Sequence, residues 1–137
     1  MCLETIDWCV KKEDEWKKDE EWKDGYKCVV MRGDKEEEKS YYAPCMCGEY
    51  VQGMQTDTNK EWIFAGHNQY YPAGYHVWIN KEDALKDKRH FEIVIKVQVR
   101  GMVAIGQNCI LPHYNDNFGQ CMVAKEMFIE GFTPIEE

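Results

Sequence analysis

The chain has 137 residues, of which 44% are hydrophobic and 13% aromatic, and this apolar content is typical of a folded domain rather than a disordered chain. Its 17 basic residues against 25 acidic ones give a net charge of −8. Because binding along the nucleic-acid backbone relies on clustered cations, this charge argues against direct nucleic-acid binding and suits a protein partner with a basic surface. No apolar run approaches the roughly 20 residues of a membrane-spanning helix, so we expect no membrane partner.

The seven cysteines are expected to be reduced thiols in the cytoplasm. Their number is odd, several lie inside apolar runs, and the first residues lack the basic and apolar segments of a secretory signal. Cys45 and Cys47 could supply two thiolates to zinc. The residues that could complete such a site are His67, His76, His113, Cys109 and Cys121. Because the pair is spaced more closely than in structural zinc sites and no second pair exists, we predict no metal site.

Residues 5–23 are predicted to form a long amphipathic helix. Thr5 can cap its first turn, and Gly25 follows its end, where a left-handed residue is favoured. The apolar stripe at helical spacing carries Trp8, Cys9, Trp16 and Trp22. The rest of the surface is charged. We expect the tryptophans to dock this helix on the rest of the domain or, as the alternative, to bind a partner.

The middle of the chain alternates strand-like runs with turns. In order, the pattern predicts a strand at 26–32, a charged loop at 34–39, a hairpin around Gly48 or an irregular strand pair at 41–55, a turn at 57–60, a short buried strand or loop at 62–64, an irregular segment at 66–74 and a strand at 75–79.

A short helix and the longest strands follow. Asn80, with an acidic residue three positions further on, can cap a helix from Lys81 to about residue 88. Residues 91–100 alternate apolar and polar side chains, which predicts a strand with one buried face. A bent or second strand is expected at 102–105 and a last strand at 120–130.

Together these elements predict an α+β fold, with a mostly antiparallel sheet, a long N-terminal helix and one short central helix. We expect a single domain over residues 1–137, with the helix at about 5–23 and the α+β body at about 25–132.

Missing motifs exclude several catalytic classes. Ser40 is the only serine and lies outside any Gly-x-Ser-x-Gly frame, so a serine-hydrolase elbow is absent. The sequence also lacks a Walker loop, a dinucleotide-binding glycine fingerprint and a His-Glu-x-x-His pair. No cysteine lies at a recognisable strand-to-helix elbow, so a cysteine–histidine nucleophile is not predicted.

Residues 70–78 are rich in aromatic side chains and include a histidine. Rings that stack on a base, beside a histidine that donates or accepts a hydrogen bond, suit a pocket for a small nucleotide. The candidate ligand-binding residues are Tyr71, Tyr75, His76, Trp78 and Arg100. In the alternative interpretation the rings fill the core and His76 bonds a backbone group.

Five short motifs resemble a known group of proteins in their order along the chain. They are GYKCV at 25–29, YPAGYHVW at 71–78, KEDA at 81–84, VQVRGMVA at 97–104 and VAKEM at 123–127. This order resembles small uncharacterised bacteriophage and prophage accessory proteins, which carry YKV, GFH, DA, VxVxG and VAxEM in turn. The resemblance spans roughly residues 25–130. It implies a phage accessory protein in the cytoplasm of the host cell, and no settled activity comes with it.

A weaker resemblance is to ADP-ribosyltransferases of the Arg-Ser-Glu type, which use NAD. Arg32 at 30–33 resembles their first element, and Glu126 at 123–128 resembles their last. Their middle Ser-Thr-Ser motif is missing, and His76 lies in that stretch instead. The resemblance implies Arg32, His76 and Glu126 as catalytic residues and NAD as the cofactor. Apart from this alternative, we predict no cofactor; enzymatic activity is left open, with a binding function favoured over catalysis.

The leading hypothesis is a phage-encoded accessory protein that acts by binding, as an inhibitor of a host defence system. In one mechanism it engages a basic groove of a host protein, as an anti-CRISPR inhibitor does. The partner-binding candidates are Trp8, Trp16, Trp22, Asp14, Glu15, Glu20 and Glu21. In the other mechanism the aromatic pocket sequesters a small nucleotide signal. An exposed strand edge would also allow a homo-oligomer.

Overall fold

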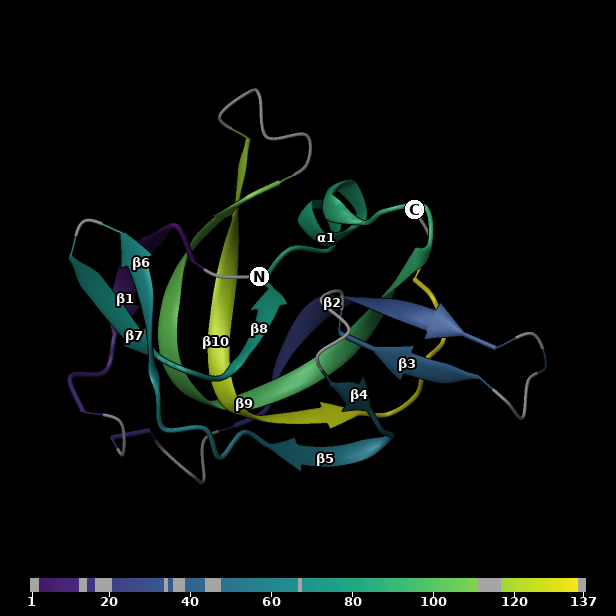
Figure 1. The fold of residues 1–137 in the computed structure, drawn as a ribbon, viewed down its shortest axis with the longest axis horizontal. Coiled ribbons are helices and arrows are strands. Elements are labelled where there is room, and N and C mark those ends of the chain that lie inside the picture. Colours follow the sequence, from purple (N-terminus) through teal and green to yellow (C-terminus); the bar gives the residue numbers. More distant parts are fainter. Residues whose placement is uncertain are drawn as a thin grey trace.

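In the computed structural model, the residues that the structure describes are 3–12, 15–16, 21–33, 35, 39–43, 48–66, 68–110 and 117–135. They form a mostly antiparallel β-structure with a single short helix among them (Figure 1). In chain order the elements are β1 Thr5–Cys9, β2 Lys23–Arg32, β3 Ser40–Tyr42, β4 Glu49–Tyr50, β5 Gly53–Thr56, β6 Trp62–Gly66, β7 Gln69–Pro72, β8 Tyr75–Trp78, α1 Lys81–Asp87, β9 Glu92–Cys109 and β10 Phe118–Ile129.

The two longest strands, β9 and β10, organise an eight-stranded sheet. They pair with each other from Phe118↔Cys109 to Phe128↔Gln98. The outer edge of β9 is shared by β2 and β1, while the outer edge of β10 is shared by β8 and β5. Because β2 pairs with both β9 and β8, the four strands β9, β10, β8 and β2 close into a ring. β3 and β4 extend the sheet beyond β2, and β6 and β7 form a separate hairpin.

The path of β9 changes at Gly101. Before this residue, Ile95, Val97 and Val99 point to one side of the sheet, and after it Val103 points to the other. Gly101 has a positive φ of 73°, and the register between β9 and β10 shifts next to it, which marks a β-bulge. A bulge adds one unpaired residue and increases the local twist. Both long strands therefore curve strongly along their length (Figure 1).

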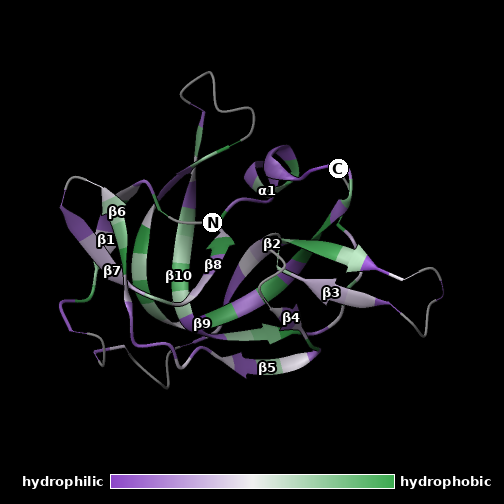
Figure 2. Ribbon diagram, in the orientation of Figure 1, coloured by the Kyte–Doolittle hydropathy of each residue, from purple (hydrophilic) through white to green (hydrophobic). Residues whose placement is uncertain are grey.

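Two hydrophobic cores lie on opposite sides of this curved sheet. The first is lined by β8, β9 and β10 and covered by α1, the β6–β7 hairpin and the N-terminal segment; its fully buried members include Tyr71, Trp78, Val103 and Val123. The second fills the ring, with Val77, Val97 and Met127 among its members. Figure 2 shows the corresponding hydrophobic residues along these strands.

The predicted N-terminal helix at residues 5–23 is wrong, and with it the α+β class. Residues Thr5–Cys9 form β1, which pairs antiparallel with β9 from Thr5↔Gln107 to Cys9↔Ala104. The described residues between β1 and β2 are not helical. These residues form a strand rather than a helix because the edge of β9 supplies backbone hydrogen-bond partners. Thr, Ile and Trp also suit a pleated surface. The three tryptophans do not share one helical stripe: Trp16 packs over Gly101, Trp22 lies beside Phe128, and Trp8 is 48% exposed.

The later elements follow the sequence pattern more closely. The short helix expected from Lys81 is α1, and Asn80 precedes it in an extended conformation. Strands predicted at 26–32, 75–79 and 120–130 correspond to β2, β8 and β10, while 91–100 and 102–105 belong to one strand, β9. The irregular segment expected at 66–74 is instead largely the second half of the β6–β7 hairpin. No helix in the described part of the chain is long and apolar enough to cross a membrane.

Candidate functional site

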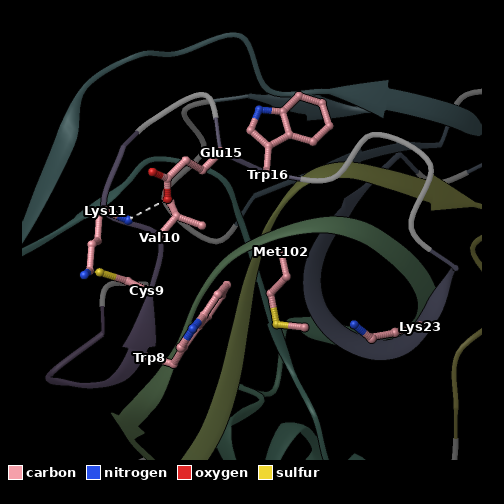
Figure 3. Close-up of a pocket in the computed structure, with 8 residues that line it drawn as sticks. All are labelled: Trp8, Cys9, Val10, Lys11, Glu15, Trp16, Lys23 and Met102. Carbon is pink, nitrogen blue, oxygen red and sulfur yellow. Dashed lines mark hydrogen bonds between the residues drawn. The ribbon is translucent and has the colours of Figure 1, made fainter.

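A groove of about 500 Å³ opens where β1 and the segment after it cross β9 (Figure 3). Its lining combines two indole rings, a thioether, two ammonium groups and one carboxylate. The lining residues are Trp8, Cys9, Val10, Lys11, Glu15, Trp16, Lys23 and Met102. A volume of this size falls within the range of small-molecule sites, about 300–1,000 Å³.

Backbone pairing and one close ring contact shape the groove. The N–H of Val10 donates to the carbonyl of Val103 at 2.9 Å, which holds the segment after β1 against β9. Trp8 and Met102 lie beside each other near β9, and Trp16 lies across the hollow from them (Figure 3). The Trp16 ring packs over Gly101, where a Cβ would overlap it. Trp8 is 48% exposed, so its ring is accessible to a ligand.

Charged side chains border the groove at its two ends. Lys11 follows β1, and Lys23 is the first residue of β2, paired with Val99 of β9. Both lysines are exposed. The Glu15 carboxylate accepts a hydrogen bond from the backbone N–H of Lys11 at 3.3 Å. The lining therefore carries two positive charges and one negative charge.

The structure brings together part of the predicted partner-binding set. Trp8, Glu15 and Trp16 line the groove. Trp22 lies outside it, with its ring 6.2 Å from that of Phe128. Glu21 is exposed. The other two members of that set, Asp14 and Glu20, lie outside the described residues.

The predicted aromatic ligand pocket is occupied by packed side chains. Tyr71 and Trp78 are 0% and 1% exposed and belong to the first core. Tyr75 is half-buried beside the second core, where burial first, and then the charge of Asp57, raises its pKa to about 12. The fifth predicted residue, Arg100, lies at the bend of β9 and makes other contacts.

His76 is the centre of a buried hydrogen-bond chain. The Leu3 N–H donates to the Tyr71 hydroxyl oxygen at 2.8 Å. That hydroxyl lies 2.9 Å from Nε2 of His76, and Nδ1 of His76 lies 3.1 Å from the carbonyl of Gly74. These contacts are satisfied when Tyr71 donates to Nε2 and Nδ1 carries the proton. Burial first, and then the nearby charge of Lys27, lowers the His76 pKa to about 3, so the imidazole is neutral at pH 7.

The residues of the transferase alternative lie on separate strands. Arg32 ends β2, opposite Ser40 of β3. Glu126 lies on β10, and its Oε1 accepts a hydrogen bond from Nε of Arg100 at 2.9 Å. The guanidinium of Arg100 also stacks on Trp22, 4.3 Å from the ring centroid. Within the described residues, no interaction joins any two of Arg32, His76 and Glu126.

The described cysteines are buried or half-buried thiols. Burial raises the pKa of Cys28 to about 12 and that of Cys121 still further, so both stay protonated at neutral pH. The described residues contain no group of three metal-ligating side chains. Four of the zinc candidates, Cys45, Cys47, His67 and His113, lie outside the described residues.

The β6–β7 hairpin presents a second surface, which the sequence interpretation missed. On its outer side Trp62, Phe64 and Tyr70 are 38%, 55% and 53% exposed. Phe64 and Tyr70 are direct cross-strand partners with ring centroids 5.2 Å apart. Ile63 and Tyr71 point inward to the first core. The sequence signal for this surface is an apolar residue at every position of 62–65, because a strand with one solvent-facing side normally alternates apolar and polar residues.

Comparison with known proteins adds no relative. The chain matches no protein-family model, no curated protein and no solved structure.

Proposed function

We propose that this chain is a phage- or prophage-encoded accessory protein that acts by binding a host protein, with the outer face of the β6–β7 hairpin as its main contact. The observation that carries the proposal is the exposure of Trp62, Phe64 and Tyr70 on one side of the hairpin. Contiguous exposed aromatics mark interaction sites because their burial by a partner is favourable. Trp and Tyr are also the residues that most often dominate binding energy at protein interfaces.

The charge of the chain favours a partner with a basic surface. With a net charge of −8, the chain attracts such a partner at long range and speeds association. At the contact itself, lysine or arginine side chains of the partner can lie over the exposed rings in cation–π contacts, each worth roughly 0.5–2 kcal/mol. The aromatic face then supplies affinity, and the acidic surface supplies steering.

The motif order over residues 25–130 supports the biological setting of the proposal. Its resemblance to phage accessory proteins favours a role inside an infected bacterium, and inhibition of a host defence protein is the function we infer. The host protein that binds the chain would show which defence system is inhibited, so the experiment is designed to recover and identify this partner.

The experiment compares tagged wild type with two variants in a bacterial host lysate, using native mass spectrometry of the recovered complexes. The hairpin variant, which combines Phe64→Ser with Tyr70→Ser, should lose a stoichiometric host protein that wild type retains. Phe91→Ser is the control, because Phe91 is also about half exposed (48%) but lies outside the hairpin. The proposal fails if wild type recovers no stoichiometric protein, or if Phe91→Ser and the hairpin variant lose it equally.

A further inference from the structure

The hydrogen-bonding pattern of the β6–β7 hairpin determines where its backbone groups point. The Ala73 N–H donates to the Glu61 carbonyl at 2.9 Å, so these two residues form a hydrogen-bonded pair. Hydrogen-bonded and non-hydrogen-bonded pairs alternate along an antiparallel ladder. Trp62 and Phe64, one and three positions further on, therefore lie in non-hydrogen-bonded pairs. The backbone N–H and C=O groups of these two residues point away from β7.

The outer edge of β6 is open as a result. Among the described residues, no hydrogen bond joins the outward backbone groups of Trp62 or Phe64 to a partner. The outer edge of β7 is less suited to pairing, because Pro72 has no N–H and the Tyr70 carbonyl already accepts the Cys9 thiol at 3.9 Å. Since Trp62 and Phe64 also carry exposed rings, β6 combines an open edge with an aromatic face.

We infer that an extended, basic segment of the partner adds to β6 as a third, antiparallel strand. The inference rests on the proposed function, because it describes how a partner engages the same hairpin. An edge strand with unpaired N–H and C=O groups is a template for strand addition. A partner residue opposite Trp62 or Phe64 exchanges backbone hydrogen bonds with it and places its own side chain beside the ring. Lysine or arginine at every second position of the segment then lies within reach of cation–π contact.

The net charge of the chain distinguishes a basic segment from a second copy of this chain. A second copy also presents β6, but it brings another net charge of −8, which opposes self-association. The same charge attracts a segment that bears lysine or arginine. Main-chain pairing supplies affinity with little dependence on sequence, and the alternating cations supply the preference for this partner.

The first test titrates wild type with a blocked peptide in which lysine and threonine alternate, followed by NMR. The peptide should bind saturably with a dissociation constant below about 1 mM. At about ten times this constant, amide hydrogen exchange of Trp62 and Phe64 should slow about 10-fold. Thr56 of β5 is the internal control: the Asp57 N–H donates to the Lys125 carbonyl, so by the same alternation the Thr56 N–H points away from β10. Because β5 has no aromatic ring, exchange at Thr56 should not change.

Methylation of the peptide backbone separates strand pairing from binding through side chains alone. With the lysine side chains beside the rings, the lysine N–H groups point toward β6 and the threonine N–H groups point away from it. N-methylation of the lysines should abolish binding. N-methylation of the threonines is the matched control and should leave binding nearly unchanged. A peptide with glutamate in place of lysine should bind at least about 10-fold more weakly.

On the protein, Trp62→Pro is compared with Trp62→Ser. Both remove the ring, but only proline also removes the outward N–H, and the first residue of a strand tolerates proline. Trp62→Pro should bind the peptide about 5-fold more weakly than Trp62→Ser, as expected for the loss of one hydrogen bond. Thermal unfolding checks the fold of both variants. The methylated peptides, tested on wild type, keep the test decisive if Trp62→Pro unfolds.

Four results would overturn the inference. They are no saturable binding of the lysine–threonine peptide at about 1 mM, equal binding of the two methylated peptides, unchanged amide exchange at Trp62 and Phe64 in saturating peptide, and a wild-type dimer in sedimentation equilibrium that Trp62→Pro abolishes. If the strand test fails while the variant with Phe64→Ser and Tyr70→Ser still loses its host protein, the partner binds through side chains and the proposed function stands. If the strand test succeeds and no host protein is recovered, the proposed function alone fails.

Discussion

Tyr71 and His76 are joined inside the first core, where the tyrosine hydroxyl lies 2.9 Å from Nε2 of the imidazole. The same hydroxyl accepts the Leu3 N–H, and His76 also contacts the Gly74 carbonyl. The chain of contacts links the N-terminal segment to the turn before β8. A proton added to Nε2 of His76 would disrupt these contacts, because Nε2 accepts the hydrogen bond that the Tyr71 hydroxyl donates.

The stability of the fold should therefore fall in mild acid. The folded-state pKa of His76 is about 3, below the unfolded-state value of 6.5, so the unfolded chain takes up the proton first. The stability that neutral His76 contributes to the fold is intact above pH 6.5 and is lost as the pH falls toward 3. At pH 5 the loss is roughly 2 kcal/mol. Urea unfolding between pH 7.5 and pH 5 measures it.

The matched variants for this pH dependence are His76→Gln and His90→Gln. His76→Gln should flatten the change in unfolding free energy between these pH values, while His90→Gln, at an exposed site, should keep it. If the two variants retain the same slope, His76 is not the group responsible.

Removal of the Tyr71 hydroxyl should destabilise the fold by about 1–3 kcal/mol, because Tyr71→Phe leaves the buried Leu3 N–H and Nε2 of His76 without their partner. Tyr70→Phe is the neighbouring control, since Tyr70 is 53% exposed and should change little. Chemical unfolding of both variants at pH 7.5 provides the comparison. Equal stability of Tyr71→Phe and wild type would contradict the proposed hydrogen-bond chain.

Gly101→Ala should lower the free energy of unfolding by at least about 2 kcal/mol. Alanine is strained at a φ of 73°, and its Cβ would overlap the ring of Trp16. Gly48→Ala is the control, because no atom lies near the place that its Cβ would take and its φ is not in the left-handed region. Thermal unfolding should separate the two variants clearly; a Gly101→Ala protein as stable as the control would argue against the positive φ at Gly101 and the packing of Trp16 over it.

The Arg100–Glu126 ion pair should show a measurable coupling energy. Its side chains are 26% and 9% exposed, and Trp22 covers the guanidinium. A double-mutant cycle with alanine at both positions should give roughly 1–2 kcal/mol. The same cycle on Asp24 and Lys96, 3.4 Å apart and about half exposed, should give less than about 0.5 kcal/mol. Equal coupling in both cycles would show that burial does not strengthen the first pair.

Local pattern was sufficient to predict the later elements. The alternation at 91–100 predicts a strand because one face of β9 packs against a core along its whole first half. The α1 helix is likewise predictable, since Glu82 and Asp83 favour its first turn, although the side chain of Asn80 makes no capping hydrogen bond. Such signals depend on neighbours in sequence, so no tertiary information is needed to read them.

Tertiary structure decided the N-terminal segment and the candidate sites. Residues 5–9 become a strand because β9, about a hundred residues further on, offers them an unpaired edge. Trp8, Trp16 and Met102 line one groove because β9, bent next to Gly101, passes beneath the segment after β1. The same aromatic character that predicted a pocket at Tyr71 and Trp78 instead fills a core. The aromatic content of the sequence determines that rings will either fill a core or remain exposed on the surface. Long-range strand pairing determines which rings take each role.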